Sequence, residues 1–292
     1  MSRPAHYLAL PVLAFASPCF AQAVPESAVE ETAPSPEIAP TASDQRPVEM
    51  DAAELAKELA NPLASVIVIP IQQDIDFGIG PDNDGVKATL NVQPLIPIDL
   101  THGSNLISRT IFSVIYMNAE AAGESVFGLG DTLQSFFVSP KNPTKGGIIW
   151  GAGPVILLPT ATDPLLGGQK WGAGPTFVAL KQKGGWTAGA LINHIWSFVG
   201  NDSRDDISQT YMEPFVYYTW PSTVSVSASV ETLYDWKIKA WTAPINVLVS
   251  KIVRIGKQDA SIAGGARYFI ERPVDGPNWG LRMSLTLLFP KH

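Results

Sequence analysis

The feature of this sequence that most restricts the fold is a strict two-residue alternation close to the C-terminus, from Trp279 to Phe289. One row of side chains is apolar throughout: Trp279, Leu281, Met283, Leu285, Leu287 and Phe289. The other row is smaller or more polar: Gly280, Arg282, Ser284, Thr286 and Leu288. Because successive side chains of a strand point to opposite faces, the pattern predicts a β-strand. Two settings fit it, a transmembrane strand between hydrocarbon and water and a half-buried strand of a soluble sandwich.

The composition distinguishes these two settings. Of the 292 residues, 46% are hydrophobic and 16% are charged, whereas soluble domains carry roughly 25% charged residues. No stretch approaches the ~18 consecutive apolar residues that a membrane helix needs. A transmembrane β-barrel combines these two properties, because only alternate residues of its strands face lipid. The net charge of −7 argues against nucleic acid as a partner, since nucleic-acid binding requires a basic surface.

Residues 1–23 have the pattern of a signal peptide. A basic start is followed by an apolar run, Tyr7 to Ala16, and the small residues around position 22 form an A-x-A cleavage site. The only cysteine of the chain, Cys19, lies inside this segment. Lipid modification of Cys19 is an alternative, which Pro18 directly before it makes a poor fit. Cleavage after position 23 leaves a mature chain without disulfides, so its stability must come from noncovalent structure.

The next two segments differ in pattern. Residues 24–50 are rich in Pro, Glu and Ala and lack apolar periodicity, which predicts a disordered linker. Residues 51–62 contain a helix signal over Asp51–Leu59, in which Leu55 and Leu59 lie one turn apart. A helix this short is marginal alone. We therefore expect it to plug the periplasmic mouth of the barrel or, alternatively, to lie on the membrane surface.

From residue 63 to residue 290 the chain shows alternating apolar segments at a near-regular spacing. They predict an all-β fold, a transmembrane antiparallel β-barrel of about twelve strands. The expected strands are Ile67–Ile79, Val86–Asp99, Asn105–Met117, Phe127–Ser139, Gly147–Pro159, Lys170–Gln182, Trp186–Val199, Ile207–Trp220, Thr223–Asp235, Ala240–Val253, Ala260–Glu271 and Trp279–Phe289. Pro94 and Pro97 each remove a ladder donor, so we expect bulges or bends in the second strand.

The connections between these strands alternate between short turns and loops that are mostly longer or more acidic. Short periplasmic turns and longer extracellular loops are typical of outer-membrane barrels. With an even strand count both chain ends lie on the side of the short turns. The N-terminal tail is therefore expected in the periplasm.

Tryptophans fall near the ends of the predicted strands. Amphipathic rings are enriched at both membrane–water interfaces, so this placement predicts two aromatic belts. Core packing is the alternative interpretation. The residues concerned are Trp150, Trp171, Trp186, Trp196, Trp220, Trp236, Trp241 and Trp279.

A five-residue motif occurs twice. Trp-Gly-Ala-Gly-Pro at 150–154 recurs at 171–175, a separation that matches one strand and one loop. A phosphate-binding glycine loop is a poor interpretation, because no helix N-terminus follows. We expect structural glycines that permit strong twist or close approach of neighbouring strands.

Together with Phe127–Asp131, Leu165–Lys170 and Asn193–Phe198, the two copies of this motif carry a family resemblance. The chain resembles Gram-negative outer-membrane "transporter" barrels, often mislabelled neuromedin U, which are similar to the barrel family named for the meta-pathway of phenol degradation. The resemblance covers roughly residues 54–290. It implies an outer-membrane β-barrel that moves small, often hydrophobic molecules, and it supplies no ligand residues.

Charged residues at inward positions of the predicted strands are candidates for lining the lumen. They are Asp74, Asp76, Lys87, Glu231, Asp235, Arg254, Arg267 and Arg282. Two interpretations apply to this set: ion pairs that stabilise the barrel, and a constriction that selects solutes.

A hydrolase is the enzymatic alternative, because His194 has Ser197 nearby on the same strand. Positions three apart face opposite sides of a strand, so Ser197 cannot reach His194. A serine from another strand stays possible. No G-x-S-x-G or H-E-x-x-H motif occurs, and four histidines without a mature cysteine make a metal site improbable.

The sequence thus predicts a non-enzymatic channel or transporter without a cofactor, through which a small solute passes passively. Hydrophobic and aromatic compounds are among the candidate solutes. A non-transporting structural or surface-interaction barrel is the alternative, and a lipid-active hydrolase is a further one. The expected partners are outer-membrane lipid, lipopolysaccharide, the unknown solute and the barrel-assembly machinery, which would bind the C-terminal strand.

Overall fold

The computed structural model describes residues 52–118, 125–256 and 258–289. The predicted signal peptide (1–23), the predicted linker (24–50) and the capping residue Asp51 lie outside the described residues. One helix, α1, and fifteen strand segments are present: α1 (Ala52–Leu59), β1 (Ile67–Ile79), β2 (Gly85–Val92), β3 (Leu95–Thr101), β4 (Ser104–Asn118), β5 (Ser125–Leu129), β6 (Thr132–Pro140), β7 (Ile148–Leu158), β8 (Lys170–Lys183), β9 (Trp186–Gly200), β10 (Ser208–Thr219), β11 (Val224–Val230), β12 (Thr232–Asp235), β13 (Ala240–Ile255), β14 (Gln258–Glu271) and β15 (Trp279–Phe289).

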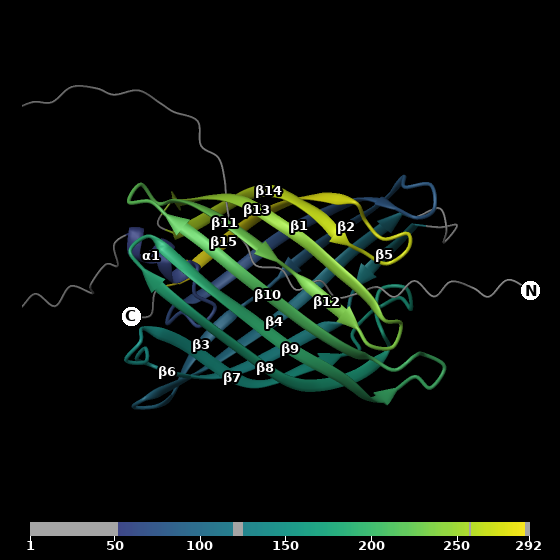
Figure 1. Cartoon of the computed structure of the whole chain (residues 1–292), viewed down its shortest axis with the longest axis horizontal. Coiled ribbons are helices and arrows are strands. Elements are labelled where there is room, and N and C mark those ends of the chain that lie inside the picture. The colour runs from purple at the N-terminus through teal and green to yellow at the C-terminus, as the bar shows by residue number, and fades with distance from the viewer. Residues whose placement is uncertain (1–51, 119–124, 257, 290–292) are drawn as a thin grey trace, which may run out of the picture.

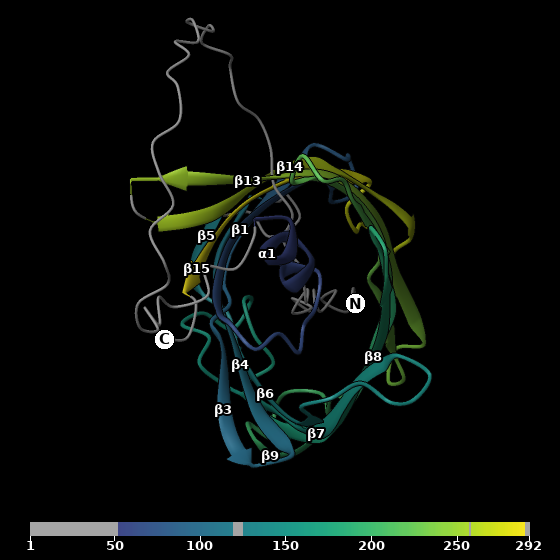
Figure 2. The ribbon, with the colours of Figure 1, turned by 90° about the vertical axis from the view of Figure 1, so that its left-hand side faces the viewer.

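These segments form one closed antiparallel barrel (Figures 1 and 2). β2 and β3, β5 and β6, and β11 and β12 are each one interrupted strand, so the barrel has twelve strands, as predicted. The first and last strands close it, with Ile67 opposite Phe289 and Phe77 opposite Trp279. Closure leaves no sheet edge, which is what allows a β-structure to cross a membrane. Among the described residues, no helix is long and apolar enough to span a membrane.

The second strand shows how the barrel accommodates its prolines. The ladder is interrupted between Val92 and Leu95, around Pro94, but its register against β4 is the same on both sides. No residue is inserted at Pro94, so of the two expected irregularities, a bulge or a bend, the bulge is absent there. A register shift occurs later, between Asp99 and Thr101.

The alternation in the last strand has the predicted orientation. Along β15 the even-numbered residues are buried, and the odd-numbered ones are exposed or half-buried on the outer surface. Arg282 has no exposed surface, whereas Met283 is 49% exposed. The polar row of this strand therefore faces the lumen, and its apolar row forms part of the outer surface.

All eight tryptophans are exposed on the outer surface, which excludes the core-packing interpretation. They gather at both ends of the strands, as a membrane-interface role requires. Trp150, Trp186 and Trp220 lie at the end with the short turns, which we call the short-turn end. The other end is the long-loop end, and it carries Trp171, Trp196, Trp236, Trp241 and Trp279.

The repeated motif lies on neighbouring strands, β7 and β8, where Pro154 is directly opposite Pro175. Its second glycine allows close strand contact in both copies. A β-carbon at Gly153 would lie 2.1 Å from the carbonyl oxygen of Phe136, and one at Gly174 would lie 1.7 Å from that of His194. No other residue fits at these two positions, so the glycines are structural.

Candidate functional site: the barrel lumen

The inner surface of the barrel has two chemically different parts. One part, the apolar wall, consists of the inward side chains of β6 to β9, and its core residues are Leu133, Phe137, Val155, Leu157, Val178, Leu191 and Ile195. The other part, the charged wall, consists of the inward side chains of β10 to β15, β1 and β2. Its fully or nearly fully buried charged residues are Asp74, Asp76, Glu213, Glu231, Asp235, Arg267 and Arg282.

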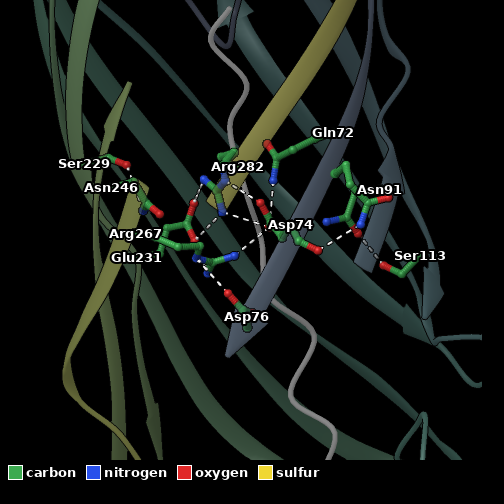
Figure 3. Close-up of polar contacts among 11 residues, drawn as sticks. Gln72, Asp74, Asp76, Asn91, Ser113, Ser229, Glu231, Asn246, Arg267 and Arg282 are labelled. Atoms are coloured by element: carbon green, nitrogen blue, oxygen red, sulfur yellow. Dashed lines mark hydrogen bonds and ion pairs between the residues drawn. The ribbon is translucent and has the colours of Figure 1, made fainter. Parts of the chain in front are cut away.

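Arg282 is the centre of the charged wall (Figure 3). Its Nε and Nη2 donate to the two carboxylate oxygens of Asp74, at 2.7 and 3.0 Å. Its Nη1 and Nη2 donate to the two oxygens of Glu231, at 2.6 and 3.2 Å. One guanidinium therefore joins a carboxylate of β1 to a carboxylate that follows β11. Paired, fork-like bonds of this kind are the strong form of charge-assisted hydrogen bonding.

Arg267 joins the same carboxylates from the neighbouring strand. Its Nη1 lies 2.7 Å from Asp74 Oδ2, its Nη2 lies 3.4 Å from Glu231 Oε2, and its Nε lies 3.5 Å from Asp76 Oδ1. The arginine side chains are 0% exposed. Burying an unpaired charge costs several kcal/mol, so the pairing explains how these five groups coexist inside the barrel. We call Asp74, Asp76, Glu231, Arg267 and Arg282 the ion cluster.

Amide side chains surround the ion cluster (Figure 3). Gln72 Nε2 donates to Asp74 Oδ2 at 3.0 Å, and Ser113 Oγ donates to Asn91 Oδ1 at 2.7 Å. Within the described part of the chain, Gln72 Oε1, Asn91 Nδ2 and Asn246 Oδ1 are buried without a hydrogen-bond partner. The lumen therefore offers neutral donors and acceptors to water or to a solute, while the charges of the ion cluster engage one another.

Of the eight predicted lumen residues, six lie in or beside the ion cluster and two lie elsewhere. Five of them form the ion cluster, and Lys87 lies opposite Asp76 in the β1–β2 ladder. Asp235 is separate, because its Oδ1 accepts from the backbone N–H groups of Lys237 and Ile238 and so holds the β12–β13 turn. Arg254 is at the short-turn end, where its 65% exposed side chain pairs with Asp259 at 2.8 Å.

Sequence reasoning missed a second polar group of the lumen. Tyr211 donates its hydroxyl to Glu213 Oε2 at 2.9 Å, and Glu213 is fully buried on β10. From the opposite side, Arg109 of β4 donates to Gln93 Oε1 at 2.8 Å and interacts electrostatically with Glu213. Glu213 lies between Met212 and Pro214, which face outward. Two-residue alternation in the expected strand Ile207–Trp220 could therefore have identified Glu213 as an inward charge.

The first described residues, from α1 to the start of β1, lie inside the barrel at the short-turn end (Figure 2). Leu55 of α1 is 2% exposed, and the following residues Leu63 and Ala64 belong to the same apolar core as the apolar wall. Gln182 of β8 donates its Nε2 to the carbonyl oxygen of Lys57 at 2.8 Å, which caps the end of the helix. The amphipathic helix therefore buries its apolar side in the mouth of the barrel and not on an outer surface. We call residues 52–66 the plug.

A small cavity remains between the plug and the charged wall. Its volume is about 50 Å³, which is room for a few water molecules and not for an organic solute. Hydroxyl groups of Ser225, Ser250, Ser261 and Thr286 line one side, and Leu59 with Ala60 lines the other. At this place the described residues leave no room for an organic solute between the plug and the charged wall.

His194 lies on the outer surface, near the long-loop end. Its Nδ1 is 2.7 Å from Thr210 Oγ1, and its Nε2 is 3.4 Å from Ser208 Oγ on the neighbouring strand. Its ring centroid lies 4.0 Å from that of Trp196. A serine from another strand is therefore within reach, while no carboxylate or amide of the described residues bonds the ring. No group of described His, Cys, Asp and Glu side chains is arranged to hold a metal ion.

Comparisons with known proteins bear on the fold. No family model and no curated protein sequence matches the chain. An outer membrane channel from Pseudomonas putida F1 superimposes with a TM-score of 0.60 at 16% identity, over 77% of this chain and 94% of that one. Outer membrane phospholipase A from Escherichia coli gives a TM-score of 0.41 at 12% identity, over 77% and 96%. The calcium-bound dimer of the Salmonella typhi phospholipase gives 0.42 at 12%, over 83% and 99%. The first likeness shows a shared barrel fold, whereas the scores of the other two are too low to support an argument.

Proposed function

We propose that this protein is an outer-membrane channel for small solutes, closed at rest by its own N-terminal segment. The observation that carries the proposal is the position of the plug. The barrel wall is closed by its own hydrogen-bond ladder without any contribution from residues 52–66, and these residues occupy the lumen instead. A segment that is not part of the wall can leave the lumen without opening the wall. The likeness to the Pseudomonas channel supports the same function.

The two walls of the lumen favour an amphipathic and neutral solute. The apolar wall offers contact surface to a hydrocarbon or aromatic ring, while unpaired amide atoms at Gln72 and Asn91 offer hydrogen bonds. The guanidinium of Arg282 is bonded to two carboxylates, so a solute anion would compete with both. We therefore infer that neutral alcohols and phenols pass more readily than carboxylates of the same size.

The proposal includes an orientation. The short-turn end faces the periplasm, with the N-terminal tail on that side, and the long-loop end faces lipopolysaccharide. The exposed tryptophan belts at both strand ends support a membrane position. The last strand, with its apolar outer row, is the segment that we expect the barrel-assembly machinery to bind.

Two measurements test this function. The protein should fractionate with outer membranes and migrate faster on gels before boiling than after, because a closed ladder resists unfolding. Cells that carry it should accumulate benzyl alcohol faster than cells without it, with a smaller difference for benzoate. Recovery as a soluble periplasmic protein contradicts the membrane position, and equal accumulation favours a structural or surface-interaction barrel.

A lipid-active hydrolase is a second candidate, favoured by one observation. Ser208 and His194 have the contact that a nucleophile and its base require, although the distance is long. Thr210 occupies the place of the group that orients the base. Purified protein assayed with a short-chain ester should show activity that Ser208→Ala and His194→Ala both abolish. Absence of ester hydrolysis leaves His194 as an interface residue beside Trp196.

A further inference from the structure

The connection between β7 and β8, residues 159–169, folds into the long-loop mouth instead of extending away from it. Thr162 accepts a hydrogen bond on Oγ1 from the Leu129 N–H at 2.9 Å, and its own N–H donates to the Leu129 carbonyl at 3.1 Å. These bonds attach the loop to β5, whose ladder partner is β4 alone. Leu166 is only 2% exposed. We call residues 159–169 the inner loop.

The inner loop lies on the lumen side of β5. A β-carbon at Gly128 would meet Thr162 Oγ1 at 2.2 Å and Leu166 Cδ1 at 3.1 Å, and one at Gly130 would meet the inward side chain of Ile115 at 2.9 Å. Positions 128 and 130 both belong to the inward row, so the glycines create the space that the loop occupies. The loop therefore covers the inner face of β5 at this end.

A single carboxylate fastens both ends of the inner loop. Asp131 Oδ1 accepts from the Ala161 N–H at 3.1 Å, and Asp131 Oδ2 accepts from the Gly168 N–H at 2.7 Å. Asp131 sits where the β5–β6 strand is interrupted, which frees its side chain from the regular ladder. Bonds from a carboxylate to backbone N–H groups are charge-assisted and strong.

An arginine holds the loop from the other side. Arg204, in the connection between β9 and β10, donates its Nη2 to the carbonyl oxygens of Pro164 and Gly167, each at 2.9 Å. A β-carbon at Gly168 would lie 2.7 Å from the Ile207 side chain, so the loop also packs against that connection. The inner loop thus extends from β5 across to the β9–β10 connection, and side-chain bonds hold it at both places.

We propose that the inner loop is a second gate of the channel, at the mouth opposite the plug, and that Asp131 and Arg204 are its latch. This inference rests on the proposed channel function and adds the regulation of entry from the outside. Release of the latch removes four hydrogen bonds but leaves every rung of the barrel ladder in place. Solute entering from the long-loop side then meets this gate before the ion cluster.

The first test measures access to the lumen and does not depend on transport. Ile115 is inward, 5% exposed and next to the inner loop, and Cys19 falls in the predicted signal peptide, so Ile115→Cys supplies a single reporter thiol. In intact cells a membrane-impermeant maleimide should label this thiol roughly tenfold faster when Asp131→Ala is added. Asp82→Ala, an exposed carboxylate on the same end, is the matched control and should leave the rate unchanged. Equal labelling rates in all three proteins overturn the gate.

The second test locks the gate. A β-carbon at position 128 would lie 3.5 Å from that of Thr162, a separation suited to a disulfide. In Gly128→Cys/Thr162→Cys, planar-bilayer current should disappear on oxidation and return with reductant. Thr132→Cys/Thr160→Cys, whose native hydroxyls are 2.7 Å apart at the base of the loop, should conduct equally in both states.

The two tests separate the possible failures. Equal, measurable current in the oxidised and reduced forms of Gly128→Cys/Thr162→Cys contradicts the gate but not the proposed channel function. Absence of current in both forms, and also after deletion of residues 24–59, contradicts the channel itself, and maleimide labelling then still decides whether the inner loop moves.

Discussion

The charged wall and the apolar wall face the same lumen but are stabilised in different ways. On the apolar wall, side chains such as Phe137 and Val178 fill space, and any side chain of similar volume serves nearly as well. On the charged wall, Arg282 and Arg267 satisfy three carboxylates, two from β1 and one that follows β11, and each group depends on the others. The comparison teaches that one wall tolerates variation and sets the volume of the lumen, whereas the other fixes strand register and sets its charge.

The largest effect should follow from breaking the ion cluster. Arg282→Ala leaves Asp74 and Glu231 with one shared arginine, Arg267, in a site without exposed surface. Unfolding in urea, followed by the gel shift between unboiled and boiled samples, should show a loss of about 4 kcal/mol. A loss below about 1 kcal/mol would mean that the ion cluster contributes no more to the free energy of unfolding than an exposed ion pair does.

A smaller effect is expected from an equivalent truncation of the apolar wall. Leu191→Ala removes a side chain that is 1% exposed and should cost about 3 kcal/mol through lost burial and a cavity. Leu191→Met, which keeps the volume, should cost less than about 1.5 kcal/mol. If Leu191→Met is as damaging as Leu191→Ala, the apolar wall depends on shape and not on volume, and the comparison above is wrong.

A change of charge without a large change of shape sharpens the comparison. Glu231→Gln removes one negative charge, so the ion cluster changes from three carboxylates and two arginines to two of each. The reversal potential in a salt gradient should move toward anion selectivity, with a permeability ratio changed roughly threefold. The matched substitution Asn193→Gln, at an inward position of β9, should leave the ratio unchanged. An unchanged ratio in Glu231→Gln would place the conducting path away from the charged wall.

The smallest effect should come from the exposed pair at the short-turn end. Arg254→Ala removes a partner of Asp259, and the arginine side chain is 65% exposed. Water and salt screen such a pair, so the free energy of unfolding should fall by less than about 1 kcal/mol. A loss equal to that of Arg282→Ala would show that burial does not separate the two arginines.

The sequence was sufficient for the strands, because parity assigns each side chain to a face without knowledge of its partners. The even row of β15 is buried and its odd row is outward, as the alternation predicted. The helix ends at Leu59, as expected, and the tryptophans lie at the strand ends. All of these features follow from local periodicity.

Parity could not identify which inward charges meet. Arg254 and Arg267 were equivalent candidates, yet one lies at the rim and the other in the ion cluster, because strand tilt and register set the height of each residue in the lumen. Parity alone would have placed Glu213 inward, but its electrostatic interaction with Arg109 crosses from β10 to β4, and parity cannot predict such a pairing. The latch between Asp131 and the inner loop was hidden for the same reason, as it joins backbone groups of a connection that has no periodicity.

Planar-bilayer current of the mature protein with and without residues 24–59 tests the central claim most directly. This deletion removes α1 and its apolar contact through Leu55, while the wall ladder that begins at Ile67 remains. An unchanged gel shift between unboiled and boiled samples would show that the shortened barrel folds. We predict low, flickering current for the complete mature chain and a larger, steadier current after the deletion. Equal currents from two folded proteins would contradict closure by α1 and would leave residues 60–66, the ion cluster and the inner loop as the barriers.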